Sequence, residues 1–244
     1  MSGFFSGLKT EGMEKTEDRL GGYTPLDTDA YDVRITMAYA TKSDGGANAV
    51  NIVGTIPSEG DREYRETIYI TSKKGDNFYE KDGKKFELPG FTTINNICLV
   101  TVEQEISELE ADEKMVKIYD RDKKEEVPTS VPTFPALAGQ MVTLGIQRVM
   151  ENVNEKSGNE YVPTVKTREF NQIDTVFHHE SKRTVVEARN GKEEAEFFAK
   201  WVEKNKGQTR DNRTIKDGEG GNAGRPPKAG EQKSAAPSLF GDKS

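Results

Sequence analysis

Lysine and aromatic residues alternate through the segment NFYEKDGKKFEL (77–88), whose side chains are suited to face an anion. The dipeptide Asp82-Gly83 is a strong signal for a hairpin with a two-residue turn. Such a turn predicts four cross-strand pairs: Lys81 with Lys84, Glu80 with Lys85, Tyr79 with Phe86, and Phe78 with Glu87. Two like charges directly opposite each other cost stability unless an anion lies across them. One face of this hairpin is therefore a candidate anion-binding surface with aromatic rings beside it.

Two further segments extend the pattern of cations and rings. Alternation turns these residues to one side of each predicted strand: Arg65, Tyr69 and Lys73 at 63–73, and Lys117 and Tyr119 at 114–119. Cations that follow a backbone, with rings between them, are typical of proteins that bind single-stranded nucleic acid without sequence preference. Each base stacked on a ring typically contributes about 1–3 kcal/mol there. A solvated sheet face whose tyrosines shield the hairpin fits the same pattern equally well.

The single-strand interpretation assigns two roles. Phosphate neutralisation falls to Arg65, Lys73, Lys74, Lys81, Lys84, Lys85 and Lys117, and base stacking to Tyr69, Phe78, Tyr79, Phe86 and Tyr119. Alternation places Phe78 on the opposite face from Tyr79, where it also fits a core position. An OB-type domain that works in this way binds about 4–16 nucleotides, and its affinity falls steeply with salt.

Residues with catalytic or metal-binding potential are sparse. Adjacent His178 and His179 diverge in either a strand or a helix, so a shared metal is disfavoured. Asp120 and Asp122 have the spacing that opens a calcium loop, but Lys124 occupies the next ligand position. Phosphate-binding loops and nucleophile elbows are absent from the sequence. We expect a non-enzymatic protein with no cofactor and no metal.

The elements that must position the hairpin are mostly strands. Period-two alternation predicts strands at 31–39, 50–56, 63–73, 114–119, 141–150 and 161–170. In the first of these, alternation places Tyr31, Val33, Ile35, Met37 and Tyr39 on one face.

Two helices complete the predicted elements. The spacing of Ile94, Ile97 and Cys98 predicts a short helix, and 190–204 an amphipathic one. Three strands, a short helix and further strands are the order of an OB-fold-like Greek-key barrel with added hairpins. Sandwiches and other small barrels share much of this order, so the fold class predicted from the pattern itself is mainly β.

Composition limits the possible partners and location. The 244 residues carry a formal net charge of -7, which disfavours a basic shell around duplex DNA but permits a local cationic strip. The single cysteine, Cys98, excludes an internal disulfide framework. The sequence lacks both an apolar run of roughly 18 residues and the pattern of a secretory signal at its start. We therefore predict a cytoplasmic protein without a membrane partner.

A change in composition near Gly207 predicts the domain organisation. Residues 1–206 are expected to form the core, and 207–244, rich in Gly, Pro, Ser and charge, a disordered tail. Leu239 and Phe240 are the last bulky pair in that tail and form a candidate motif for binding replication proteins. A spacer with two incidental apolar residues is the alternative. The tail has seven basic and five acidic residues, so an acidic tip is missing.

Four segments carry a family resemblance that spans most of residues 10–206: GMEKTEDRLGGYTPLDTDAY, YRETIYITSKKGDNFYEKDGKKFELPGF, KMVKIYD and FNQIDTVFHHESKRTVVEA. They resemble a group of tailed-phage proteins regarded as single-stranded DNA-binding proteins. The resemblance implies an OB-type core that coats single-stranded DNA during phage replication and recombination in the host cytoplasm, without catalysis.

Two other classes remain open at this point. A phage interaction protein that binds a host or replication protein through an acidic surface would bind no oligonucleotide. A nucleic-acid enzyme whose scattered carboxylates hold magnesium would show metal-dependent cleavage.

Overall fold

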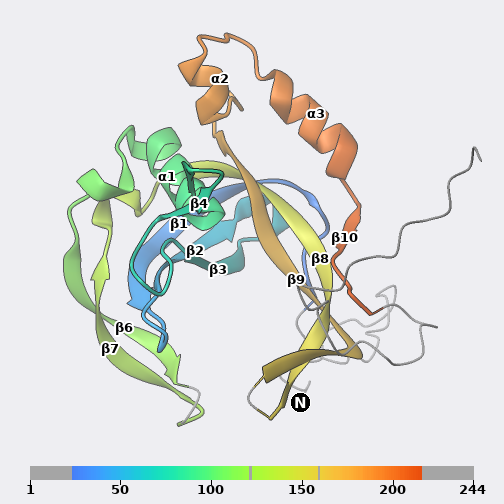
Figure 1. Ribbon diagram of the computed structural model, residues 1–244. Helices are drawn as coiled ribbons and strands as arrows, with labels where there is room; N and C mark the ends of the chain where they lie inside the picture. Colours follow the sequence, from blue (N-terminus) through green and yellow to red (C-terminus); the bar gives the residue numbers. More distant parts are fainter. Residues whose placement is uncertain (1–23, 121–122, 159, 216–244) are drawn as a thin grey trace, which may run out of the picture.

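Strands dominate the computed structural model, which describes residues 24–120, 123–158 and 160–215 (Figure 1). The strands are β1 (Asp29–Lys42), β2 (Asn48–Ile56), β3 (Arg62–Tyr69), β4 (Phe78–Lys81), β5 (Lys84–Glu87), β6 (Asp112–Asp120), β7 (Glu125–Thr133), β8 (Met141–Ser157), β9 (Glu160–His178) and β10 (Thr209–Asp211). The helices are α1 (Pro89–Val102), α2 (Val185–Arg189) and α3 (Glu196–Asn205). The predicted mainly β class is confirmed. Within these described ranges, no helix combines the length and apolar character needed to cross a bilayer.

In the part of the chain that the structure describes, eight strands form one sheet and β4 pairs with β5 in a second, two-stranded sheet. The large sheet runs in the order β10-β8-β1-β2-β3, with β9 beside β8 and the β6–β7 hairpin beside β1. The first half of β1 pairs with β8, whereas its second half pairs with β2 and, at Tyr39, with Thr133 of β7. Strand β1 is therefore the common neighbour of three strands.

A β-bulge in β1 divides the apolar residues of this strand between two clusters. The register against β2 shifts between Ile35 and Met37. Val33, Ile35 and Ala38 face the main core, whereas Tyr39 and Met37 belong to a second cluster. The prediction that the five alternate residues of 31–39 share one face is therefore wrong beyond Ile35. An extra residue in one strand reverses the alternation, which no period-two pattern reveals.

Helix α1 contributes the predicted apolar residues to the main core. Ile94, Ile97 and Cys98 have no exposed surface, and burial raises the pKa of the Cys98 thiol to about 12. The start of α1 lies close against the end of β3. The approach is so tight that a Cβ atom, if residue 90 carried one, would lie 2.1 Å from the carbonyl oxygen of Tyr69, so Gly90 is required there. This contact fixes the point at which the chain leaves the β4–β5 hairpin.

A half-buried carboxylate joins β3 to β9. One oxygen of Glu66, Oε2, accepts hydrogen bonds from the hydroxyl of Tyr64 (2.6 Å) and from the backbone amide of Ile173 (2.9 Å). Burial raises the pKa of Glu66, although both hydrogen bonds oppose the shift. The strands β3 and β9, which lie on either side of α1 in the sequence, are thus linked through a side chain.

Helix α3 packs through aromatic side chains on the outer face of β8 and β9, the face that carries Phe177 and lies opposite the main core. The ring of Phe177 is fully buried and makes edge contacts with Phe198 and Trp201 at centroid distances of 5.1 and 6.2 Å. The indole nitrogen of Trp201 donates to Asp174 of β9 (2.7 Å). The helix starts at Glu196, six residues later than predicted.

The predicted tail boundary at Gly207 needs correction, because the sheet continues past it. Residues 209–211 form β10, which pairs in parallel with 148–150 of β8. Beyond the strand, the side-chain oxygen of Asn152 accepts from the amides of Thr214 (2.7 Å) and Ile215 (2.9 Å). Backbone pairing of this kind needs no apolar residues, so the polar composition misplaced the boundary. Residues 216–244 of the predicted tail lie outside the described residues.

Replacing Glu66 tests the link between β3 and β9. Because the pKa of Glu66 is raised in the folded state, the folded protein holds this proton to a higher pH than the unfolded chain. The contribution of Glu66 protonation to the free energy of unfolding should therefore fall as pH rises through and above 4.5, the ordinary pKa of a glutamate. Glu66→Gln keeps the acceptor oxygen and should remove that part of the pH dependence. Glu66→Ala leaves two donors unpaired and should cost about 1–3 kcal/mol.

Urea midpoints measured between pH 4.5 and 7 provide the readout, with Glu63→Gln as the control for loss of an exposed carboxylate from the same strand. An identical pH slope for the native protein and Glu66→Gln would contradict the assignment.

A methyl group at Gly145 should displace α3. The added Cβ would lie 2.6 Å from Cγ2 of Thr175 and 2.9 Å from Cζ2 of Trp201. Both atoms belong to packed side chains, so Gly145→Ala should destabilise the protein by about 1–3 kcal/mol, the typical range for overpacking. Thermal melting followed by Trp201 fluorescence would show the loss, and an unchanged melting temperature would contradict it.

Candidate nucleic-acid interface

The β4–β5 hairpin has the predicted register at all four positions. Phe78 pairs with Glu87, Tyr79 with Phe86, Glu80 with Lys85, and Lys81 with Lys84. Asp82 and Gly83 have φ values of 53° and 72°, as a two-residue turn with two positive φ angles requires. None of the eight strand residues is buried. The hairpin therefore projects its side chains into solvent rather than contributing to the core.

One face of the hairpin presents two aromatic rings. The rings of Tyr79 and Phe86 stack at a centroid distance of 5.6 Å and an interplanar angle of 25°. Tyr79 is 45% exposed and Phe86 42% exposed. Lys81 and Lys84 occupy the next pair on the same face, since residues two apart in a strand point the same way. The two opposed lysines thus lie beside an open aromatic surface.

The other face of the hairpin carries a cluster that neutralises itself. The ammonium nitrogen of Lys85 lies 4.1 Å from the centroid of the Phe78 ring. The same nitrogen lies 4.0 Å from the carboxylate of Glu80. Phe78 is half-buried and is not part of the core, so its alternative role as a core residue does not hold. Lys85 and Phe78 therefore already have partners, whereas Lys81 and Lys84 on the opposite face have no carboxylate within 4.0 Å among the described residues.

Ion pairing separates the predicted cations into two groups. Among the described residues, five of them have no carboxylate within 4.0 Å: Lys73, Lys74, Lys81, Lys84 and Lys117. Arg65 is paired with Glu63 at 2.7 Å, and this hydrogen bond raises the pKa of the guanidinium. The unpaired lysines are the better candidates for phosphate contacts, because an ion pair has to be broken before Arg65 binds a new anion.

Several contacts of backbone and side chain bring Tyr69, Lys73 and the hairpin to one end of the sheet. Lys73 packs against the β1–β2 turn, since its Cε would lie 3.3 Å from a Cβ on Gly45. The base of the hairpin is closed by a bond from the amide of Leu88 to the carbonyl of Asn77 (2.9 Å). Tyr69 ends β3 and is 54% exposed. The close approach of Gly90 to Tyr69 then anchors the hairpin base beside that strand end.

Strand β6 turns its predicted residues to another side. Val116 and Ile118 pack with Tyr39 and Val53 in the second cluster, and Val53 is the cross-strand partner of Arg65. Lys117 and Tyr119 occupy the alternate positions of β6, so they point away from that cluster. The structure therefore does not bring Lys117 and Tyr119 onto the face that carries Arg65.

Lys114 is the cation of β6 that the prediction missed. It lies on the same side of the strand as Val116, opposite Val131 of the second cluster, and it is exposed. Among the described residues it has no carboxylate partner within 4.0 Å. Counting the alternation from Val116 would have identified Lys114 from the sequence.

Comparison with known proteins adds no assignment. No protein family model matches the chain, and no relative is found among curated proteins. Among the residues that the structure describes, no group of three or more His, Cys, Asp or Glu side chains is placed to hold a metal. The candidate partner motif, Leu239 and Phe240, lies outside the described residues.

Reversing one charge of the opposed pair should stabilise the hairpin. Lys84→Glu places a carboxylate opposite Lys81, and opposite charges in such a pair contribute roughly 0.2–1 kcal/mol. Amide hydrogen exchange of residues 78–87 should therefore slow in the variant. Lys74→Glu has the same change of charge outside the strands and serves as the control. Faster exchange in Lys84→Glu than in the native chain would contradict the proposed repulsion.

Proposed function

We propose that this protein binds single-stranded DNA without sequence preference and has no catalytic activity. The observation that carries the proposal is the β4–β5 hairpin, where two opposed lysines lie beside the exposed stack of Tyr79 and Phe86 and have no carboxylate within 4.0 Å among the described residues. Phosphates would lie across Lys81 and Lys84, which relieves their repulsion. The rings would accept unpaired bases, which a duplex keeps stacked inside its helix.

The arrangement of the strands supports an OB-type core for this function. Strands β1, β2 and β3 follow one another in the sheet, α1 comes next, and β8 returns to pair with β1. Strand β9 then lies beside β8 and reaches β3 through Glu66. In this interpretation β4–β5 and β6–β7 are insertions on either side of α1. A five-stranded barrel of this kind uses one face and its loops to bind oligonucleotides.

The resemblance to tailed-phage single-stranded DNA-binding proteins supports the same function and suggests its setting. In that setting the protein coats DNA during phage replication and recombination in the host cytoplasm. Leu239 and Phe240 would then serve as a contact for replication proteins. The hairpin proposal does not depend on this setting, because it stands on the charges and rings of residues 78–87.

Removing both rings tests the stacking role. Tyr79→Ala combined with Phe86→Ala should weaken binding of a fluorescein-labelled oligothymidine by about 1–3 kcal/mol for each stacked base lost. Both residues are exposed, so the melting temperature should change little. Tyr119→Ala is the matched control, because it removes an exposed ring that points away from the second cluster. Equal losses in Tyr119→Ala and the double variant would exclude the hairpin as the special site.

Salt and probe type separate this function from its alternatives. Affinity for single-stranded DNA should fall steeply between low and high salt, because bound phosphates release counterions. Gel shifts with single-stranded, duplex and RNA probes of equal length provide the comparison. A protein that binds only other proteins would shift none of the three probes, and that result would overturn the proposal.

A further inference from the structure

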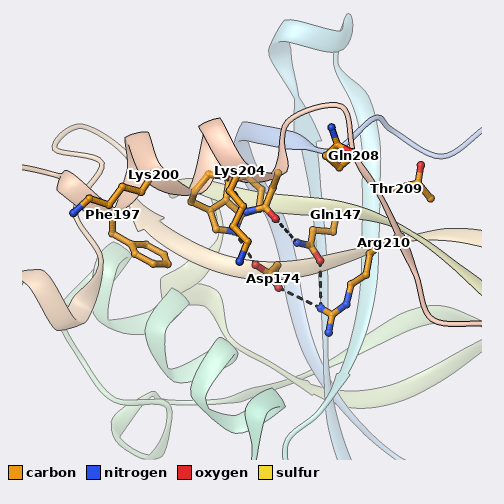
Figure 2. Close-up of a pocket in the computed structure, with 10 residues that line it drawn as sticks. Gln147, Asp174, Phe197, Lys200, Lys204, Gln208, Thr209 and Arg210 are labelled. Atoms are coloured by element: carbon orange, nitrogen blue, oxygen red, sulfur yellow. Dashed lines mark hydrogen bonds and ion pairs between the residues drawn. The ribbon is translucent and has the colours of Figure 1, made fainter.

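A pocket of about 580 Å³ lies on the side of the sheet that α3 covers (Figure 2). Its walls come from one side of α3 between Phe197 and Asn205, from β10 and Gln208 just before it, and from Gln147 of β8 and Asp174 of β9. The volume falls within the range of about 300–1,000 Å³ that small-molecule sites occupy. The pocket exists because β10 pairs with β8 beside α3, the pairing that the predicted tail boundary had excluded.

Positive charge is concentrated around this pocket. Lys200 and Lys204 lie four residues apart on α3 and therefore share one face of the helix. Arg210 enters from β10, and Figure 2 shows Lys204 and Arg210 on opposite sides of Asp174. Lys204 has no carboxylate within 4.0 Å among the described residues, whereas Lys200 lies 3.4 Å from Glu196.

The one acidic residue of the pocket already has two partners. Asp174 accepts from the indole nitrogen of Trp201 (2.7 Å) and lies 3.5 Å from Arg210. Arg210 also donates to the side-chain oxygen of Gln147 (3.3 Å), which holds the guanidinium at the pocket wall. Lys200 is paired with Glu196 and Arg210 with Asp174, so among the described residues Lys204 supplies the excess positive charge of the pocket.

Polar and aromatic groups are available beside the cations. Gln208 and Thr209 are among the residues that line the pocket, and their side chains have no hydrogen-bond partner within the described parts of the chain. Phe197 lines the pocket near Lys200, and 45% of its surface is exposed. This lining therefore suits a ligand that combines an anionic group, a flat ring and several hydrogen-bonding atoms.

We propose that this pocket binds a phosphorylated nucleoside, with the phosphate held by Lys204 and Arg210 and the base placed against Phe197. The ligand is either a free mononucleotide or one nucleotide unit of a strand, since both offer the same groups. The site is separate from the β4–β5 hairpin, because its lining residues come from α3, β8, β9, β10 and Gln208 and include none of residues 78–87. It does not depend on the proposed function of that hairpin.

The single tryptophan of the chain provides the readout. Trp201 lines the pocket, so a bound base should change its fluorescence. The full-length protein is titrated with dAMP, dTMP, thymidine, inorganic phosphate, an oligothymidine and a glutamate-rich peptide, with calorimetry as the second measurement. Saturable binding of a mononucleotide, tighter than that of phosphate or thymidine, is the expected result. An oligothymidine that binds this pocket when mononucleotides do not would identify the strand as the source.

Charge reversal locates the binding. Lys204→Glu should weaken nucleotide binding at least tenfold, whereas Arg189→Glu, the same charge change at the end of α2, should leave it unchanged. No saturable response to any nucleotide probe, tighter binding of phosphate alone or of the peptide, or equal affinity in Lys204→Glu and the native protein would each overturn the proposal.

The hairpin variant keeps the two proposals apart. Tyr79→Ala with Phe86→Ala should leave the mononucleotide response of Trp201 intact even where oligonucleotide affinity is lost. Conversely, Lys204→Glu should lose the mononucleotide response, while the rings of its hairpin remain able to bind a labelled strand. A mononucleotide response abolished by the hairpin variant would place the nucleotide at the hairpin and overturn the pocket assignment.

Discussion

The pairing of β1 with three other strands is the constraint on which the rest of the structure depends. Its first half pairs with β8, and its second half with β2 and β7. The bulge between Ile35 and Met37 turns successive residues toward different cores, so one strand supports both apolar clusters. Without that reversal, Tyr39 would face the main core and the β6–β7 hairpin would lose the side chain that its Val116 and Val131 pack against. The position of the β6–β7 hairpin therefore follows from this strand.

The hairpin could be predicted because its register is set by neighbouring residues. The bulge in β1, strand β10 and the orientation of β6 could not, because they depend on residues far away in the sequence. The Asp82-Gly83 turn fixes the register through its own backbone angles, so residues 77–88 sufficed to derive four correct pairs. The bulge in β1 depends on pairing with distant strands and leaves no mark on the alternation. Strand β10 is held through backbone pairing with β8, and the residues that follow it through Asn152, so the polar composition of this segment resembles that of a tail. The side of β6 that faces the second cluster follows from tertiary packing alone.

The position of the hairpin outside the core has a physical consequence for its side chains. Because none of its strand residues is buried, packing does not dictate their identity. Solubility alone would favour polar residues there, yet Tyr79 and Phe86 keep rings in contact with water. Opposed lysines add a repulsion that a purely structural hairpin has no reason to retain. Both features become favourable together when an anionic strand with exposed bases lies on this face.

The distribution of ion pairs explains how a chain with a net charge of -7 can attract an anion at one place. On β8 and β9 three of the four Lys and Arg side chains are paired with carboxylates: Arg148 with Glu169, Lys166 with Glu155 and Arg168 with Glu151. At the hairpin, Lys81 and Lys84 have no such partners in the described parts of the chain. Screening limits the reach of an exposed charge to about 8–10 Å, so an approaching phosphate responds to its nearest groups rather than to the total. The acids of the sheet therefore stabilise their own neighbours, while the hairpin lysines retain the capacity to bind an anion.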